Sequence, residues 1–186
     1  MVCKDGIWID PLKISIILAL PAPTNLLKLQ SLQGKENFLR RFVCNFVEKM
    51  HGYMRLLKKD TSFFWDEQAQ WAFDNIKHAL THSPVIHPSY YSKYFLLYIA
   101  SSTTTIALVL VQENPDGQKH VIYYASKNLM DSKTRYSHVE KLALAMVIDV
   151  QKFRHYIMLR TTTVLADQNP MYYILIRCSG ASIPNG

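Results

Sequence analysis

The sequence predicts an α/β (α+β) chain in which a helical segment precedes a sheet of mixed strand direction. Two observations carry this prediction. Apolar residues recur at helical spacing through roughly the first eighty residues, and three short runs of branched and aromatic residues, a long helical stretch and a fourth such run follow. A three-stranded meander joined by a crossover helix to another strand gives a mixed sheet.

Composition places the chain among globular proteins. Of its 186 residues, 49% are hydrophobic and 19% are charged, which excludes a disordered or fibrous chain and allows a sizeable core. The formal net charge of +7 fits an anionic partner such as nucleic acid, although solubility alone accounts for it equally well. Between Lys28 and Lys59 the only acids are Glu36 and Glu48, so the basic charge is concentrated there.

The sequence predicts no membrane association. The apolar stretch 14–20 is too short for a signal peptide and follows Asp5 and Asp10, which make a poor positively charged leader. No apolar run reaches the roughly 20 residues of a membrane helix. The three widely spaced cysteines indicate neither a disulfide framework nor a metal site, and they fit a reducing compartment. We therefore expect an intracellular chain, in the cytoplasm or nucleus.

Capping residues divide the first part of the helical segment. Asp10 followed by Pro11 predicts an N-cap and a first helical residue. Thr24 is expected to cap a second helix, which Gly34 ends. A third helix is expected over 38–46, with two arginines on its polar face.

The last helix of this segment is predicted to follow a short piece at 51–59 and an N-cap at Asp66. His78 and His82 are four residues apart on this helix, a spacing that suits metal binding, but two exposed histidines are the simpler interpretation. The predicted apolar stripe consists of Trp71, Ala72, Ile76 and Leu80.

The pattern then changes to strands. Strands are expected at 95–100, 106–112, 120–125 and 161–166. The turn Asn114–Gly117 separates the second strand from the third, and a long helix is predicted over Ser137–Tyr156. The buried face of that helix is predicted to include Leu142, Ala145, Met146 and Phe153. Pro170 is expected to begin another short helix.

Ordered motifs across nearly the whole chain resemble one family. In the helical part these motifs are Gly6–Lys13, Ser31–Gly34, Asn37–Phe42, Leu56–Lys59 and Phe64–Glu67. In the sheet part they are Tyr123–Lys127, Tyr136–Lys141 and Leu165–Gln168. Together they resemble the polyproteins of gypsy-type long-terminal-repeat retrotransposons, notably the plant branch.

This resemblance implies four segments. They are the end of a reverse transcriptase palm with its helical thumb at 1–60, a connection helix at 61–92, a truncated RNase H-like domain at 93–176, and an unmatched tail at 177–186. The family synthesises DNA on RNA templates and cleaves the RNA of RNA–DNA hybrids. The expected partners are therefore hybrid or duplex nucleic acid and the remainder of the polyprotein.

The same resemblance implies an incomplete metal site. RNase H chemistry uses two divalent ions, Mg²⁺ in this family, whose repulsion several carboxylates must offset. Glu140 on the long helix and Asp167 after the fourth strand match two of those carboxylates, but Ala100 stands where the family has the first-strand aspartate. The fourth carboxylate and the palm aspartates are expected outside the chain. We therefore expect a remnant site that binds Mg²⁺ weakly or not at all, and no catalysis by the chain alone.

Without the resemblance, Glu140 and Asp167 are more simply a helix N-terminal charge and a turn residue.

The thumb helices of the family lie along the nucleic acid, so the candidate phosphate contacts are Arg40, Arg41, Lys58 and Lys59. The alternatives to a remnant polymerase and nuclease are a non-catalytic nucleic-acid-binding module and a purely structural connection domain.

Overall fold

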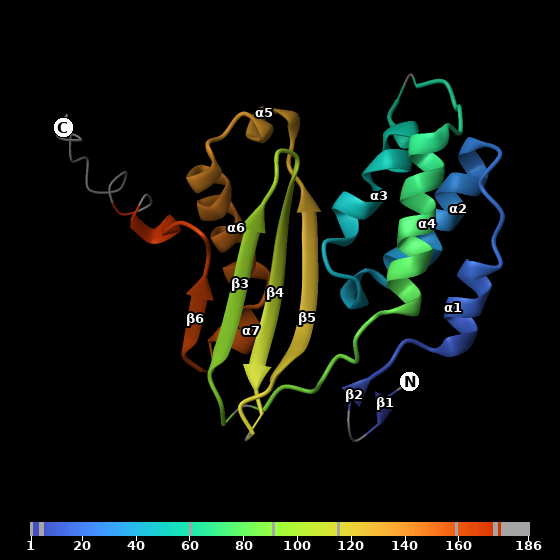
Figure 1. Cartoon of the computed structure of the whole chain (residues 1–186). Coiled ribbons are helices and arrows are strands. Elements are labelled where there is room, and N and C mark those ends of the chain that lie inside the picture. Colours follow the sequence, from blue (N-terminus) through green and yellow to red (C-terminus); the bar gives the residue numbers. More distant parts are fainter. Residues whose placement is uncertain are drawn as a thin grey trace.

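In the computed structural model, a helical body stands beside a sheet that has helices on one face (Figure 1). The structure describes residues 2–3, 6–59, 61–90, 92–114, 116–158, 160–172 and 175. The tail expected at 177–186 lies outside the described residues. The helical body contains α1 (Pro11–Leu18), α2 (Leu26–Asn37), η1 (Arg40–Phe42), α3 (Phe46–Met54), η2 (Arg55–Leu57) and α4 (Glu67–Thr81).

The first two helices begin at side-chain caps. Asp10 accepts a hydrogen bond from the backbone N–H of Leu12 at 3.0 Å, which confirms the predicted start of α1. The cap of α2 is Asn25 and not Thr24, because it is the Asn25 side chain that accepts from the backbone. Gly34 lies inside α2, so the predicted end there is wrong. The buried side chains on either side of it hold the helix together and outweigh the low helix propensity of glycine.

The expected helix over 38–46 is also wrong. After the single turn of η1, Val43 is extended and Asn45 adopts the left-handed conformation with φ 49°. Asparagine tolerates this conformation better than most residues. The chain changes direction there, and α3 starts at Phe46. The helix continues to Met54, past His51, where a separate short piece had been expected to begin.

Helix α4 begins as predicted, with Asp66 accepting from the backbone N–H of Ala69 at 2.9 Å. The predicted apolar stripe is wrong at Trp71, which is 69% exposed. Phe73 is buried instead. Because the helix turns by about 100° per residue, Phe73 lies on the side that faces the core and Trp71 lies on the side that faces solvent. The buried set is Ala69, Ala72, Phe73, Ile76 and Leu80.

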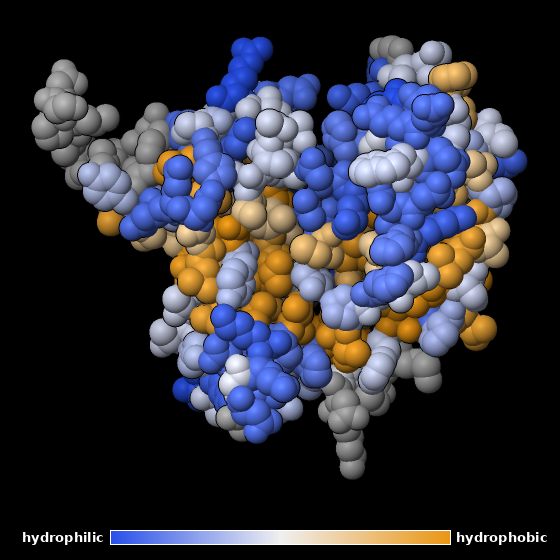
Figure 2. Space-filling view, in the orientation of Figure 1, coloured by the Kyte–Doolittle hydropathy of each residue, from blue (hydrophilic) through white to orange (hydrophobic). Residues whose placement is uncertain are grey.

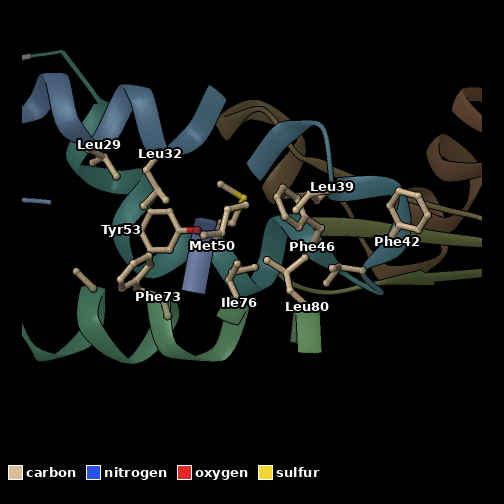
Figure 3. Packing of buried hydrophobic residues seen from close by; sticks show 14 of the residues in the cluster. Leu29, Leu32, Leu39, Phe42, Phe46, Met50, Tyr53, Phe73, Ile76 and Leu80 are labelled. Carbon is tan, nitrogen blue, oxygen red and sulfur yellow. The ribbon is translucent and has the colours of Figure 1, made fainter. Parts of the chain in front are cut away.

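A single apolar core joins these helices. Figure 3 shows Tyr53 of α3 lying between Leu32 of α2 and Phe73 of α4. Helices α3 and α4 approach most closely at Gly52, where an added Cβ would lie 2.5 Å from the carbonyl oxygen of Gln68. A glycine is therefore required at this crossing.

A short N-terminal hairpin closes the lower end of the helical body. Strand β1 (Val2–Cys3) pairs with β2 (Gly6–Ile7), and Ile7 forms a bridge to Ile86 in the segment after α4. The sequence did not predict these two strands, because two residues are too few to show a period.

The sheet has the order β5-β4-β3-β6, with β3 pairing antiparallel to β4 and parallel to β6. Its elements are β3 (Phe95–Ser101), β4 (Thr105–Glu113), β5 (Lys119–Asn128), α5 (Asp131–Thr134), α6 (His138–Lys152), α7 (Arg154–Ile157) and β6 (Thr162–Leu165). The predicted central position of the first long strand is confirmed. The predicted long helix ends four residues early, at Lys152, and Met146 is only half-buried.

Helices α6 and α7 cover one face of this sheet (Figure 1). Alternate residues of β3 point to that face and form a second core with α6. The residues of β3 and α6 in this core are Phe95, Leu97, Ile99, Leu142 and Ala145. Across the described residues, no helix is long and apolar enough to cross a membrane.

Two groups of hydrogen bonds join the helical body to the sheet, one at β5 and one at the β3–β4 turn. The Arg40 guanidinium donates to the carbonyl oxygen of Ser126 at 2.9 Å, and the hydroxyl of Ser126 accepts from the backbone N–H of Val47 at 3.1 Å. The Glu48 carboxylate accepts from the hydroxyls of Ser102, at 2.9 Å, and Thr105. These contacts, here called the body–sheet joint, fix η1 and α3 against β5 and the β3–β4 turn.

Each core also contains a buried carboxyl group. Glu36 of α2 accepts from the Tyr53 hydroxyl at 2.9 Å, while its other oxygen has no hydrogen-bond partner among the described residues. Asp149 of α6 is 0% exposed, and within the described ranges neither of its oxygens has a partner. Burial raises the pKa of Glu36 to about 7 and the pKa of Asp149 to about 8.

We predict that the free energy of unfolding falls as the pH rises from about 4 to about 8. The folded chain holds the protons of Glu36 and Asp149 more tightly than the unfolded chain does. The fall therefore begins near the ordinary pKa values of 4.5 and 3.8 and ends above the raised values. Urea unfolding across this range measures it.

Asp149→Ala should stabilise the chain most at the alkaline end and flatten this dependence, because it removes a buried carboxylate that has no hydrogen-bond partner among the described residues. Asp116→Ala, which removes an exposed carboxylate, is the matched control and should leave the fall unchanged. An Asp149→Ala chain that keeps the full dependence and gains no stability would contradict this account.

Candidate functional site

Three elements meet at one end of the sheet, where the sequence predicts the remnant metal site. Strand β6 runs parallel to β3 with Leu165 opposite Tyr98. Asp167 lies two residues beyond Leu165, in the bend that follows β6, and Ala100 lies two residues beyond Tyr98 in β3. Helix α6 begins over the same end, because its first residue, His138, is hydrogen-bonded to the last residue of β3.

His138 connects all three elements through one imidazole ring. Its Nδ1 lies 2.9 Å from the Ser101 hydroxyl, and its Nε2 lies 2.7 Å from a carboxylate oxygen of Asp167. A neutral ring protonated at Nε2 satisfies both contacts, with Ser101 donating to Nδ1 and Nε2 donating to Asp167. The bridge is partly open to solvent, since the side chains of His138 and Asp167 are 39% and 65% exposed.

Glu140 is engaged at the N-terminus of its own helix. Its carboxylate accepts from the backbone N–H of Ser137 at 2.8 Å, and the Ser137 hydroxyl accepts from the backbone N–H of Glu140 at 3.3 Å, which together form a capping box. Residues two apart on a helix do not face each other, so Glu140 projects differently from His138. These contacts agree with the helix-cap interpretation of Glu140.

The residues present do not fit a pair of divalent ions. Ala100 is exposed and brings no oxygen, and Asp167 is bonded to His138. In the part of the chain that the structure describes, no three His, Cys, Asp or Glu residues form a group that could hold a metal ion. Mg²⁺ requires well-placed oxygens in octahedral geometry, which this end of the sheet does not offer.

Sequence reasoning missed His138. It lies inside the motif Tyr136–Lys141, which was considered only for its glutamate. A histidine at the first position of a helix that starts above a strand end is within reach of that strand, but this follows only once the register of α6 over β3 is known.

The four basic candidates fall into two groups. Arg40 belongs to the body–sheet joint, and the Arg41 guanidinium lies over the rings of Phe42 and Tyr123, at 5.4 and 5.6 Å from their centroids. Both arginines are half-buried. Lys58 and Lys59, by contrast, are exposed in the segment between η2 and α4. The four candidates therefore differ in exposure and in the contacts they make within the chain.

The chain matches a family model described as the RNase H-like domain found in reverse transcriptase, over residues 65–164. It is 27% identical over 175 residues to the Retrovirus-related Pol polyprotein from transposon 297 of Drosophila melanogaster, covering 94% of this chain and 16% of the polyprotein. It is 30% identical over 144 residues to the Transposon Tf2-3 polyprotein of Schizosaccharomyces pombe, covering 77% of this chain and 11% of that polyprotein. The chain thus spans a small part of these relatives.

Solved structures share the fold. A foamy viral protease–reverse transcriptase in complex with double-stranded DNA superposes with a TM-score of 0.78 at 22% identity, covering 96% of this chain and 31% of that one. A foamy viral protease–reverse transcriptase in complex with an RNA/DNA hybrid gives a TM-score of 0.75 at 23% identity, covering 88% and 22%. Both likenesses extend over the helical body and the sheet.

We predict that His138→Ala loosens β6. This strand is short and, among the described residues, pairs with β3 alone, and the His138 bridge is a further tie beyond its end. Amide hydrogen exchange over Thr162–Leu165 should become several-fold faster, and the chain should lose about 0.2–1 kcal/mol of stability, as for exposed pairs. His51→Ala, at an exposed histidine of α3, is the control. Equal protection of β6 in both variants would sink this role for His138.

Proposed function

Because the chain belongs to the family of RNase H-like domains found in reverse transcriptases, we propose that it forms the thumb, connection and RNase H-like part of a gypsy-type retrotransposon polyprotein, plant type. The proposed segments are 1–60, 61–92 and 93–176. The order of the motifs supports this assignment, as does the likeness in fold, which extends over the helical body as well as the sheet. We further propose that the chain binds nucleic acid and does not cleave it.

The absence of cleavage is supported by one observation: at the convergence of β3, α6 and β6, a hydrogen-bonded histidine engages Asp167 and no carboxylate stands at Ala100. Two divalent ions about 4 Å apart repel by about 17 kcal/mol even at an effective dielectric near 20. Glu140 and Asp167 bring a charge of about −2 against +4. One oxygen of Asp167 is also hydrogen-bonded to His138, so at most one ion would bind, weakly.

Binding of duplex nucleic acid or RNA–DNA hybrid is supported by the charge of the helical body. The turn between η2 and α4 lies at the top of that body in Figure 1, and Figure 2 shows hydrophilic residues gathered there. Lys58 and Lys59 lie in this segment and are exposed. The foamy viral enzymes of similar fold are solved with double-stranded DNA and with hybrid, which agrees with the same class of partner.

A second candidate, a structural connection domain, is favoured by a different observation. Arg40 and Arg41, which sequence reasoning assigned to phosphates, make contacts within the chain. If all the basic residues made such internal contacts, none would be left to bind phosphates, and the chain would serve only as a structural connection. Lys58 and Lys59 are exposed, so replacing them distinguishes the two candidates.

We predict no appreciable cleavage of an RNA–DNA hybrid in Mg²⁺ or Mn²⁺. A labelled hybrid resolved on a gel measures this. Ala100→Asp should improve metal binding without giving full activity, because His138 still engages Asp167. Robust cleavage by the unmodified chain that disappears in Glu140→Gln would overturn the non-catalytic assignment.

We predict weak binding to duplex or hybrid that decreases with salt. Replacing both Lys58 and Lys59 with alanine should reduce the slope of log K against log salt by about two, or roughly one per lost phosphate contact. Arg40→Ala should instead lower stability, because it breaks the body–sheet joint.

The charge-matched control for the salt series is the pair Lys133→Ala and Arg135→Ala, at and just after α5 on the sheet side. It removes the same charge and should leave the slope nearly unchanged. Equal slopes for the Lys58/Lys59 variant and the unmodified chain would favour the structural domain.

A further inference from the structure

Two histidines stack on the exposed side of α4, outside the site described above. His78 and His82 are four residues apart, and both are exposed. Their ring centroids are 4.2 Å apart with an interplanar angle of 24°. The spacing had suggested either two residues that bind one metal ion or two unrelated surface residues. The structure brings the two rings into contact.

The contacts of His82 fix which of its nitrogens carries the proton. The Thr81 hydroxyl donates to the carbonyl oxygen of His78 at 2.7 Å, so its oxygen can only accept from the ring. The Nδ1 of His82 lies 2.8 Å from that hydroxyl oxygen and 3.0 Å from the same carbonyl. Both neighbours accept, so Nδ1 carries the proton. The neutral ring therefore presents the lone pair of Nε2 to solvent, the state that a metal-binding histidine requires.

Two further features of α4 suit a cation at this place. The pair lies at the C-terminal end of the helix, Thr81 being its last residue, where the helix dipole is negative. The opposite face of the helix is fixed in the core by Ile76 and Leu80, which are 0% and 1% exposed. The backbone positions of the two histidines are thus set before any ligand arrives, which lowers the cost of ordering on binding.

The nearest cation on this helix is held elsewhere. The Lys77 ammonium group donates to the carbonyl oxygens of Leu18 and Leu20, at 2.9 and 2.8 Å. It also lies over the ring of Phe73 at 4.3 Å from the centroid. These contacts turn it toward α1, so its charge does not occupy the histidine pair.

We propose that His78 and His82 form a two-histidine chelate for one divalent transition metal ion that prefers imidazole nitrogen, such as Ni²⁺, Cu²⁺ or Zn²⁺. Water completes the coordination. Mg²⁺ prefers oxygen ligands and should not bind there, which separates this site chemically from the remnant carboxylates. The proposal is independent of the proposed function.

Isothermal titration of the untagged full chain with Ni²⁺ at neutral pH tests the proposal. We expect one saturable ion per chain, no signal with Mg²⁺, and a thermal unfolding midpoint that rises with Ni²⁺ and returns on addition of EDTA. His78→Gln and His82→Gln should each weaken binding about tenfold or more, since each removes one of two ligands. His51→Gln, at a solitary exposed histidine, should leave it unchanged.

Thr81→Ala provides a second variant that keeps both rings. It removes one acceptor that fixes the His82 tautomer and should weaken Ni²⁺ binding without altering the circular dichroism of the chain. His87 and His120 form another close pair, at 4.8 Å between centroids. Binding that His87→Gln abolishes and His82→Gln leaves intact would overturn the proposal, as would the absence of any saturable Ni²⁺ binding.

Discussion

The arrangement of the molecule depends on the body–sheet joint, and above all on the carboxylate of Glu48 in α3. It accepts from Ser102 and Thr105 at the β3–β4 turn, and Thr105 is only 1% exposed. The contact to Thr105 is costly to break, because its buried hydroxyl would lose a partner away from water. It holds the helical body against the sheet and brings Arg40 within reach of Ser126. The joint thus engages Arg40, which the sequence had assigned to phosphate contacts, within the chain.

At the same end of β3, hydrogen bonds connect the strand, helix α6 and Asp167, where the family resemblance predicts a metal site. His138 links Ser101 to Asp167, and the capping box engages Glu140. Removing one carboxylate at Ala100 reduces the charge that holds two ions together, whereas a histidine needs no ion to connect the strand, the helix and Asp167. The three elements are therefore held together at this end without a metal ion, as the proposed non-catalytic function requires.

The sequence correctly predicted those helix starts and strands that depend on capping residues and on the spacing of apolar residues. Asp10 and Asp66 cap helices as expected, and the long apolar runs form the four strands in the expected order. It failed where tertiary packing decides: Gly34 lies inside a helix and Trp71 is exposed. The body–sheet joint and the His138 bridge connect residues far apart in the chain, so no local pattern could reveal them. For the candidate site, motif matching gave the positions of the carboxylates but not their partners.

The central claim is that a histidine bridge, and not a pair of ions, occupies the end of β3. Crystals of the chain soaked in Mn²⁺ and measured at the manganese absorption edge test it most directly. The account predicts that His138 remains bonded to Ser101 and Asp167. It also predicts no pair of anomalous peaks between Glu140 and Asp167. Two manganese peaks about 4 Å apart, with His138 displaced from Asp167, would contradict the account.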